Sequence, residues 1–335
     1  MEKGIIGKSE LAKLVEAMAA DATCLGPVKD GQDTVLAELG PDTELSFDYA
    51  NFRLPVKRLF FPQSEVTCVL RDGQLVALPP PDEKTVLFGV RPCDAQALPY
   101  LTKIFSDEKY EDPYYLKRRE NAVIVSLACH TPCSTCFCTS LGGSPAGRAG
   151  CDILAFDLGH ELLLEAETEK GKALLAAHEA LFAAPTDAQV TAAAEQGAAA
   201  EASMAKIETD GITEKADQAF DAPLWEEIAA RCVACGVCTY LCPTCHCFGF
   251  ADEQVGNRTQ RVKCQDACMF PLFTLEASGH NPRTTQGQRL RQRIMHKFSY
   301  TVKNVGEIFC VGCGRCVLYC PVNIDLREII EEVRK

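Results

Sequence analysis

The sequence predicts an α/β domain at the amino terminus and an all-α domain at the carboxy terminus. Two short apolar runs that are rich in β-branched residues, KTVLFGV (84–90) and NAVIVSLA (121–128), flank a helical stretch and indicate parallel strands. A CxxCxxCxxxCP spacing occurs twice after residue 230, beside segments of helix-forming composition. The first pattern predicts the α/β class, and the second predicts a compact domain built from short helices.

We expect three segments along the chain. Residues 1–184 form the α/β domain, which ends with a helix that follows a predicted hairpin. Residues 185–221 form a helical linker, because they are rich in Ala, the strongest helix former. Residues 222–335 contain both cysteine runs and form the all-α domain.

Composition and charge exclude several classes of protein. A chain of 335 residues with 47% hydrophobic and 24% charged residues is typical of a globular protein with two domains. The first twenty residues read as an amphipathic helix and lack the features of a signal peptide, so the 20 cysteines indicate the reducing cytoplasm. We expect no transmembrane segment, since no long apolar stretch is free of charges. A net charge of −12 argues against binding to nucleic acid.

The repeated spacing is the strongest chemical signal in the chain. The first run extends from Cys232 to Pro243 and the second from Cys310 to Pro321. In such runs three closely spaced thiolates hold one [4Fe–4S] cluster, and the cysteine before the proline completes the cluster of the other run. The crossed pairing predicts cluster I at Cys232, Cys235, Cys238 and Cys320, and cluster II at Cys310, Cys313, Cys316 and Cys242. Zinc also binds CxxC pairs, but it does not explain the third and fourth cysteines or the proline.

A further group of thiols lies in the first domain. Cys93 and Cys129 each follow a predicted strand, and the carboxyl ends of parallel strands meet at the edge where α/β sheets hold their ligands. The loop that begins at Cys129 adds three more thiols, Cys133, Cys136 and Cys138. Soft thiolates bind iron–sulfur clusters and zinc alike, so both kinds of site remain open at this point.

The long insertion between the two runs carries thiols that the crossed pairing leaves unused. The element CPTCHC adds Cys245 and Cys247, and a CxxxC element adds Cys264 and Cys268. Residues 283–297 then contain five basic residues and no acidic one. Because clusters held by four thiolates are anionic, we interpret this basic stretch as a source of compensating charge.

Several of these elements together resemble the beta subunits of cytoplasmic sulfhydrogenases and the first subunits of anaerobic sulfite reductases. The elements are FGVRPCD around Cys93, the CFC that ends at Cys138, CPTCHC, DACMF, SGHNPR and CVGCGRCVLYCP. The resemblance implies a multi-cluster electron-transfer subunit with no catalytic residues and an alpha-helical ferredoxin-like second domain. Its implied partners are an FAD- and NAD(P)H-binding flavoprotein and a terminal enzyme, which is a hydrogenase, a heterodisulfide-reductase-like module or a sulfite reductase.

The resemblance also implies ligands for two more clusters. Carried over position by position, the ligands of cluster III are Cys93, Cys129, Cys136 and Cys138. A fourth cluster would use Cys245, Cys247, Cys268 and His296, since His296 stands where related subunits can carry a cysteine. Cys264 is the alternative to this histidine. Cys133 and Cys264 depart from the family pattern, so whether they bind a cluster stays open.

Two other functions compete with the electron-transfer subunit. The chain could itself reduce polysulfide or a similar sulfur species at a cluster with an open coordination site, and a non-cysteine ligand such as His296 favours this reading. A zinc-stapled scaffold protein is the second alternative. No GxGxxG fingerprint follows a strand, so we do not expect the chain to bind NAD(P) by itself.

Overall fold

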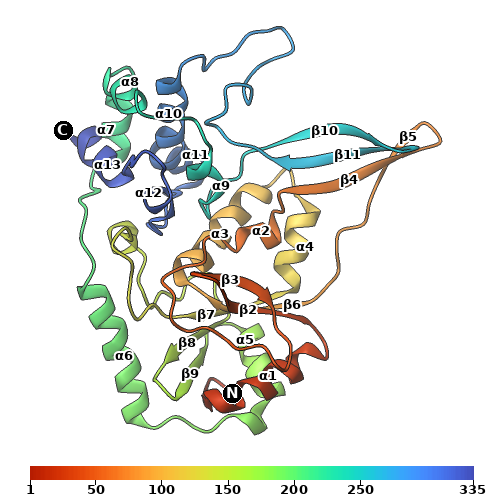
Figure 1. The fold of residues 1–335 in the computed structure, drawn as a ribbon, viewed down its shortest axis with the longest axis vertical. Helices are drawn as coiled ribbons and strands as arrows, with labels where there is room; N and C mark the ends of the chain where they lie inside the picture. The colour runs from red at the N-terminus through yellow and green to blue at the C-terminus, as the bar shows by residue number, and fades with distance from the viewer. The chain divides into compact units, whose positions relative to one another are not determined.

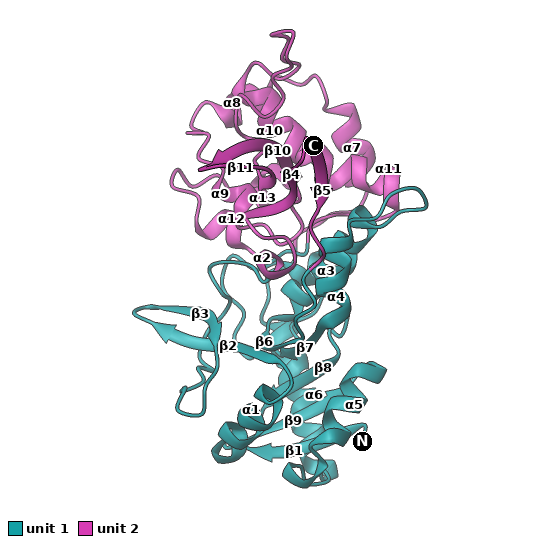
Figure 2. Ribbon diagram, turned by 90° about the vertical axis from the view of Figure 1, so that its right-hand side faces the viewer, with its two compact units in different colours: residues 1–56, 81–206, 311–313 teal, residues 57–80, 207–310, 314–335 magenta.

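The computed structural model describes residues 1–335, which form two compact units that interleave along the chain. The first unit contains residues 1–56, 81–206 and 311–313, and the second contains residues 57–80, 207–310 and 314–335 (Figure 2). No helix in either unit combines the length and the apolar character needed to span a lipid bilayer. The predicted domain boundaries at residues 184 and 221 remain predictions about how the chain folds.

A seven-stranded mixed sheet organises the first unit, with strand order β1-β9-β8-β7-β6-β2-β3 (Figure 1). Its strands are β1 Lys3–Gly7, β2 Thr23–Asp30, β3 Asp33–Glu38, β6 Thr85–Val90, β7 Ala122–Leu127, β8 Ile153–Asp157 and β9 Glu161–Ala166. The central strands β2, β6, β7 and β8 run parallel, whereas the outer pairings are antiparallel. The prediction that β6 and β7 are parallel is therefore confirmed, and their carboxyl ends meet at one edge of the sheet.

Five α-helices accompany this sheet: α1 Leu11–Ala19, α3 Pro92–Phe105, α4 Pro113–Asn121, α5 Glu169–Ala177 and α6 Asp187–Ala202. Pro92 suits the first turn of α3, where its missing N–H group has no helical partner to lose. The Ala-rich segment forms α6 as predicted, and a capping box between Thr186 and Gln189 begins it. The expected amphipathic helix at the start of the chain is only partly correct, since β1 occupies its first residues.

The second unit contains a four-stranded antiparallel sheet, so the prediction of an all-α carboxy-terminal domain is wrong. Its strands are β4 Ser64–Arg71, β5 Gln74–Ala77, β10 Phe248–Val255 and β11 Arg258–Gln265, in the order β10-β11-β4-β5. Nearly every side chain of β10 is exposed, so this strand lacks the alternation of apolar and polar residues that predicts a half-buried strand. Its partner β11 pairs with β4, which lies almost two hundred residues earlier in the sequence, and no local pattern announces such a pairing.

Short helices make up the rest of the second unit: α2 Lys57–Phe60, α7 Ile212–Gln218, α8 Leu224–Ala229, α9 Val237–Tyr240, α10 Gln286–Met295, α11 Thr301–Val305, α12 Arg315–Leu318 and α13 Leu326–Arg334. A π-helical turn, His296–Tyr300, separates α10 from α11. Turns of this kind occur often at functional sites. The helices α9 and α12 begin inside the two cysteine runs and contact each other, so the flanking helices that the runs predicted are present.

Candidate cluster sites

The two cysteine runs have the same backbone conformation. Ala234 and Gly312 occupy equivalent places in the runs and have φ angles of 54° and 59°. Gly236 and Gly314 also correspond, with φ angles of 75° and 73°, and each precedes a short helix. The internal repeat is therefore a repeat of structure, because left-handed residues turn the chain at the same two points of each run.

Gly312 has a packing role that Ala234 lacks. Its carbonyl accepts a hydrogen bond from the Phe137 amide at 2.8 Å, within the first unit. A Cβ atom at residue 312 would lie 2.5 Å from the amide nitrogen of Cys138. This close approach explains why the second run carries glycine where the first run tolerates alanine.

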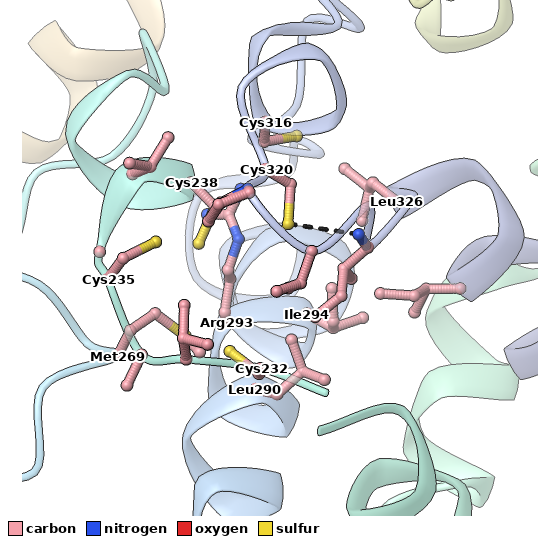
Figure 3. A pocket seen from close by; sticks show the side chains of 18 residues that line it. Cys232, Cys235, Cys238, Met269, Leu290, Arg293, Ile294, Cys316, Cys320 and Leu326 are labelled. Atoms are coloured by element: carbon pink, nitrogen blue, oxygen red, sulfur yellow. Dashed lines mark hydrogen bonds between the residues drawn. The ribbon is translucent and has the colours of Figure 1, made fainter. Parts of the chain in front are cut away.

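The thiols predicted for cluster I surround a single cavity of the second unit, which we call the cluster I cavity (Figure 3). Three of them come from the first run and one, Cys320, comes from the second. The cysteines on its wall are Cys232, Cys235, Cys238, Cys316 and Cys320. Apolar side chains such as Leu290 and Ile294 make up much of the remaining wall. The structure thus brings together the four ligands that the crossed pairing assigns to cluster I.

Two N–H groups point at sulfurs of this cavity. The side-chain amide of Gln286 donates to Cys232 Sγ at 3.3 Å, and the backbone amide of Ile324 donates to Cys320 Sγ at 3.2 Å. Hydrogen bonds to thiolate sulfur stabilise the added negative charge of a reduced cluster, and so raise its reduction potential. The two N–H groups therefore stabilise negative charge on both sulfurs.

The residues predicted for cluster II are only partly brought together. Cys242 and Cys310 are buried in the second unit. Although burial lowers the pKa of Lys297, these two thiols raise it. Cys316 lines the cluster I cavity instead, and Cys313 belongs to the segment 311–313 of the first unit. The ligand set of cluster II remains a prediction.

In the first unit, the cysteines predicted for cluster III line a second cavity, which we call the Cys93 cavity. Cys93 is in the first turn of α3, and Cys129 follows the carboxyl end of β7. The cysteines on the wall of this cavity are Cys93, Cys129, Cys136, Cys138 and Cys313. Cys313 is the thiol that the sequence did not place here, since its spacing assigns it to the second run.

Cys133 does not line the Cys93 cavity. Its sulfur lies 2.8 Å from Cys136 Sγ and 3.2 Å from the hydroxyl of Thr135. It does line a larger, polar cavity of the same unit, together with Lys8 and Arg91. Cys133 thus contacts Cys136, one of the four thiols that the family resemblance selects, without lining their cavity.

The Cys93 cavity has no cationic side chain on its wall. The nearby Arg91 directs its guanidinium at backbone carbonyl groups, those of Leu127 at 3.2 Å and Ala128 at 2.9 Å, and at Tyr49. Burial raises the pKa of the Cys138 thiol to about 12. Arg91 is nevertheless close enough to favour the thiolate form of Cys129, although burial outweighs it and raises the pKa of that thiol.

A third cavity, the Cys245 cavity, lies in the second unit beside the long insertion. Its wall includes Cys245, His246, Cys247, Cys268, Arg283, Arg293, His296 and Lys297, so it gathers all four residues of the fourth predicted cluster. Cys264 is not on this wall. It lies on β11, where its sulfur is 3.9 Å from the hydroxyl of Ser64.

Three buried cations donate hydrogen bonds to the CPTCHC element, and two of them, Arg293 and Lys297, also line the Cys245 cavity. Lys297 Nζ donates to Cys242 Sγ at 3.1 Å, and Arg293 Nη1 donates to Cys245 Sγ at 3.4 Å. Lys57 Nζ donates to the carbonyl of Cys245 at 2.7 Å, and burial lowers its pKa. The sequence did not indicate Lys57, which arrives from a segment that is distant in the chain. Buried cations require anionic partners, so this arrangement fits thiolate-bound clusters, which are anionic.

The arrangement of the thiols differs from that of a zinc site. No group of three or more His, Cys, Asp or Glu side chains converges on a point that could hold one metal ion. Four ligands of a tetrahedral zinc ion lie within about 4 Å of one another, given its ~2.3 Å bonds to sulfur.

Two comparisons with known proteins agree with these sites. The family model described as a 4Fe-4S dicluster domain matches residues 231–324, which contain both cysteine runs. The chain is also 33% identical over 312 residues to the sulfhydrogenase 2 subunit beta of Pyrococcus furiosus, and the match covers 92% of each chain. Both findings confirm the resemblance seen in the motifs. The chain therefore belongs to the family of sulfhydrogenase beta subunits, and it is an iron–sulfur electron-transfer subunit that carries [4Fe–4S] clusters.

Proposed function

We propose that this chain relays electrons between an FAD- and NAD(P)H-binding flavoprotein and a terminal redox enzyme. The terminal enzyme is a hydrogenase by its likeness to the Pyrococcus furiosus protein, whose name makes it a subunit of a sulfhydrogenase. A heterodisulfide-reductase-like module or a sulfite reductase would use the same relay. The observation that carries the proposal is the cluster I cavity, where thiols of both runs meet.

The relay uses four [4Fe–4S] clusters. Cluster I binds to Cys232, Cys235, Cys238 and Cys320, and cluster II binds to Cys310, Cys313, Cys316 and Cys242. Cluster III binds to Cys93, Cys129, Cys136 and Cys138, whose thiols share one cavity. The fourth cluster binds to Cys245, Cys247, Cys268 and His296. The presence of His296 on the cavity wall, and the absence of Cys264 from it, support the histidine ligand.

The protein residues supply orientation, apolar surroundings and charge. Each cubane, when bound, would accept and release single electrons. Leu290 and Ile294 form an apolar part of the cluster I wall, whereas Cys235 is exposed, and exposure to solvent is one of the properties that set a reduction potential. The N–H groups of Gln286 and Ile324 favour added negative charge at the same site.

We place the protein in the cytoplasm. None of its 20 cysteines forms a disulfide, and disulfides are rare in reducing compartments. The thiols thus stay available as thiolate ligands. Purification in the absence of oxygen is the matching condition for every experiment below.

The proposal is tested by following the visible absorption of the anaerobically purified full chain. NAD(P)H alone is expected to leave the iron–sulfur absorption unchanged, since the chain has no dinucleotide fingerprint. Addition of an FAD- and NAD(P)H-binding flavoprotein from a sulfhydrogenase complex should let NAD(P)H bleach the absorption. Bleaching of the isolated chain by NAD(P)H, or hydrogen turnover by the chain alone, contradicts the relay.

A second candidate function is the reduction of polysulfide or a similar sulfur species at the Cys245 cavity. The observation in its favour is that only three thiols, Cys245, Cys247 and Cys268, line this cavity, which leaves one coordination site to His296 or to an external ligand. Release of sulfide from polysulfide by the reduced, isolated chain would favour this function. A chain that reduces no polysulfide without its partners leaves the relay as the function.

A further inference from the structure

One side chain lies on the walls of both cavities of the second unit. Arg293 is in the last turn of α10 and lines the cluster I cavity and the Cys245 cavity. Its side chain extends from the helix toward Cys238 (Figure 3). Cys316 and Cys245 are also close enough to interact electrostatically with its guanidinium. Arg293 is only 4% exposed. A single buried cation therefore stands between two groups of thiols.

The hydrogen bonds of Arg293 are incomplete. Nη1 donates to Cys245 Sγ at 3.4 Å, whereas Nη2 is buried and has no hydrogen-bond partner among the protein atoms. Although burial lowers the pKa of Arg293, the surrounding thiols, Cys238 first, raise it well above its usual value. Leaving a buried cationic donor unpaired is costly, so the structure calls for an acceptor that the protein does not contain.

The neighbouring Lys297 differs in this respect. Its Nζ donates to three acceptors, Cys242 Sγ at 3.1 Å, Thr244 Oγ1 at 3.1 Å and the carbonyl of Phe309 at 2.9 Å. Lys297 lies in the π-helical turn that follows α10. The protein thus satisfies Lys297 completely, while Arg293 keeps a donor for another group.

We propose that Arg293 is a shared counter-charge for the two cavities and that its guanidinium donates hydrogen bonds to sulfur in both. This inference rests on the proposed cluster I and on the proposed fourth cluster in the Cys245 cavity. Positive charge and N–H donors near a cluster favour its reduced, more negative form. The reduction potentials of both centres should therefore depend on this one side chain, which acts as a positioning and tuning residue.

The experiment is a redox titration of the full chain, followed by electron paramagnetic resonance, for wild type and Arg293→Gln. Variants Cys320→Ser and Cys268→Ser identify which signals belong to the two centres. The matched control is Arg291→Gln, which removes the same charge from the same helix. Arg291 lines neither cavity, and it contacts Phe220 and Asp221 instead.

Arg293→Gln should shift the midpoint potentials of both centres to more negative values, while Arg291→Gln leaves both unchanged. Arg293→Lys, which keeps the charge, should restore part of both shifts. A shift of one centre alone, or of neither, overturns the shared role while the relay stands. If Arg293→Gln loses iron, Arg293→Lys is titrated in its place. Its two midpoint potentials should then both differ from those of wild type, and a shift of one centre alone, or of neither, overturns the shared role. A wild-type protein without the Cys268 signal overturns the fourth cluster, and the inference with it.

Discussion

The Cys93 cavity of the first unit and the Cys245 cavity of the second unit present the same ligand chemistry in opposite electrostatic surroundings. The Cys93 cavity has thiols and no cation on its wall. The nearby Arg91 donates hydrogen bonds to backbone carbonyl groups and not to the thiols. The Cys245 cavity has three thiols, two histidines and three cations on its wall. From this difference we infer that the positions of the cysteines decide where clusters bind, and that buried cations decide how easily each cluster is reduced.

The comparison orders the potentials within the chain. A cluster in the Cys93 cavity should have the lower potential, since no cation lies on its wall and Arg91 acts on its thiols from outside the wall. A cluster in the Cys245 cavity should have the higher potential, because cations surround it and a neutral imidazole replaces a thiolate, as in Rieske centres. Electrons would then leave the first site and collect at the second.

The largest effect is expected from the ligands of the Cys93 cavity. Cys129→Ser should remove cluster III and with it about four irons per chain, the content of one cubane. Cys151→Ser is the matched control, since Cys151 lies outside this cavity and its thiol donates to the carbonyl of Arg148, and it should keep full iron content. Iron analysis of both variants checks the prediction, and equal losses in the two would contradict the assignment of Cys129 to the cluster.

Cys320→Ser tests the crossed pairing in the second unit. It should damage the cluster of the first run, although Cys320 belongs to the second, because its sulfur lies on the wall of the cluster I cavity. Electron paramagnetic resonance of the reduced variant measures this change. An altered signal from the cluster of Cys310, Cys313 and Cys316, with the other signal intact, would show that each run serves itself.

The histidine ligand sharpens the contrast between the two cavities. His296→Ala should change or remove the signal of the fourth cluster, while Cys264→Ala should leave every signal unchanged, because Cys264 lies on β11 away from the cavity wall. His296→Cys should keep the cluster and lower its potential, since thiolate brings back negative charge. If only the Cys264 variant loses a signal, cysteine is the fourth ligand and the cavity is less distinct than we propose.

The smallest effect concerns the backbone of the two runs. Gly312→Ala should lower the free energy of unfolding by about 1–3 kcal/mol, because its Cβ would overlap the backbone at Cys138. Ala234→Gly is the reciprocal control, and relief of the left-handed strain at Ala234 should leave stability within about 1 kcal/mol of wild type. Thermal unfolding under anaerobic conditions compares the two. Equal stability of wild type and Gly312→Ala would contradict this packing role.

Local patterns in the sequence were sufficient to group cysteines that lie close together in the chain. The spacing of Cys232, Cys235 and Cys238 identified one side of the cluster I cavity, and the strand ends before Cys93 and Cys129 identified the edge at which they meet. These cysteines could be grouped from the sequence because spacing within a run, and the direction of parallel strands, are local properties; their role as ligands stays a prediction.

Residues that reach a site from distant segments could not be predicted in this way. Lys57 bonds to the carbonyl of Cys245, 188 residues away, and the strand β4 pairs with β11 across a similar separation. No local pattern in the sequence predicts either contact. The hairpin of β10 and β11 did leave a signal, the turn at Gly256 with φ 63°, but its exposed strands carry no apolar alternation to accompany it.

The iron and acid-labile sulfide content of the anaerobically purified full chain, with zinc measured in the same sample, tests the central claim most directly. Four cubanes predict about sixteen irons and sixteen sulfides per chain, and no stoichiometric zinc. About twelve irons would remove one of the four sites. Eight irons, or zinc in place of iron, would contradict the account, because the Cys93 and Cys245 cavities would then hold no cluster.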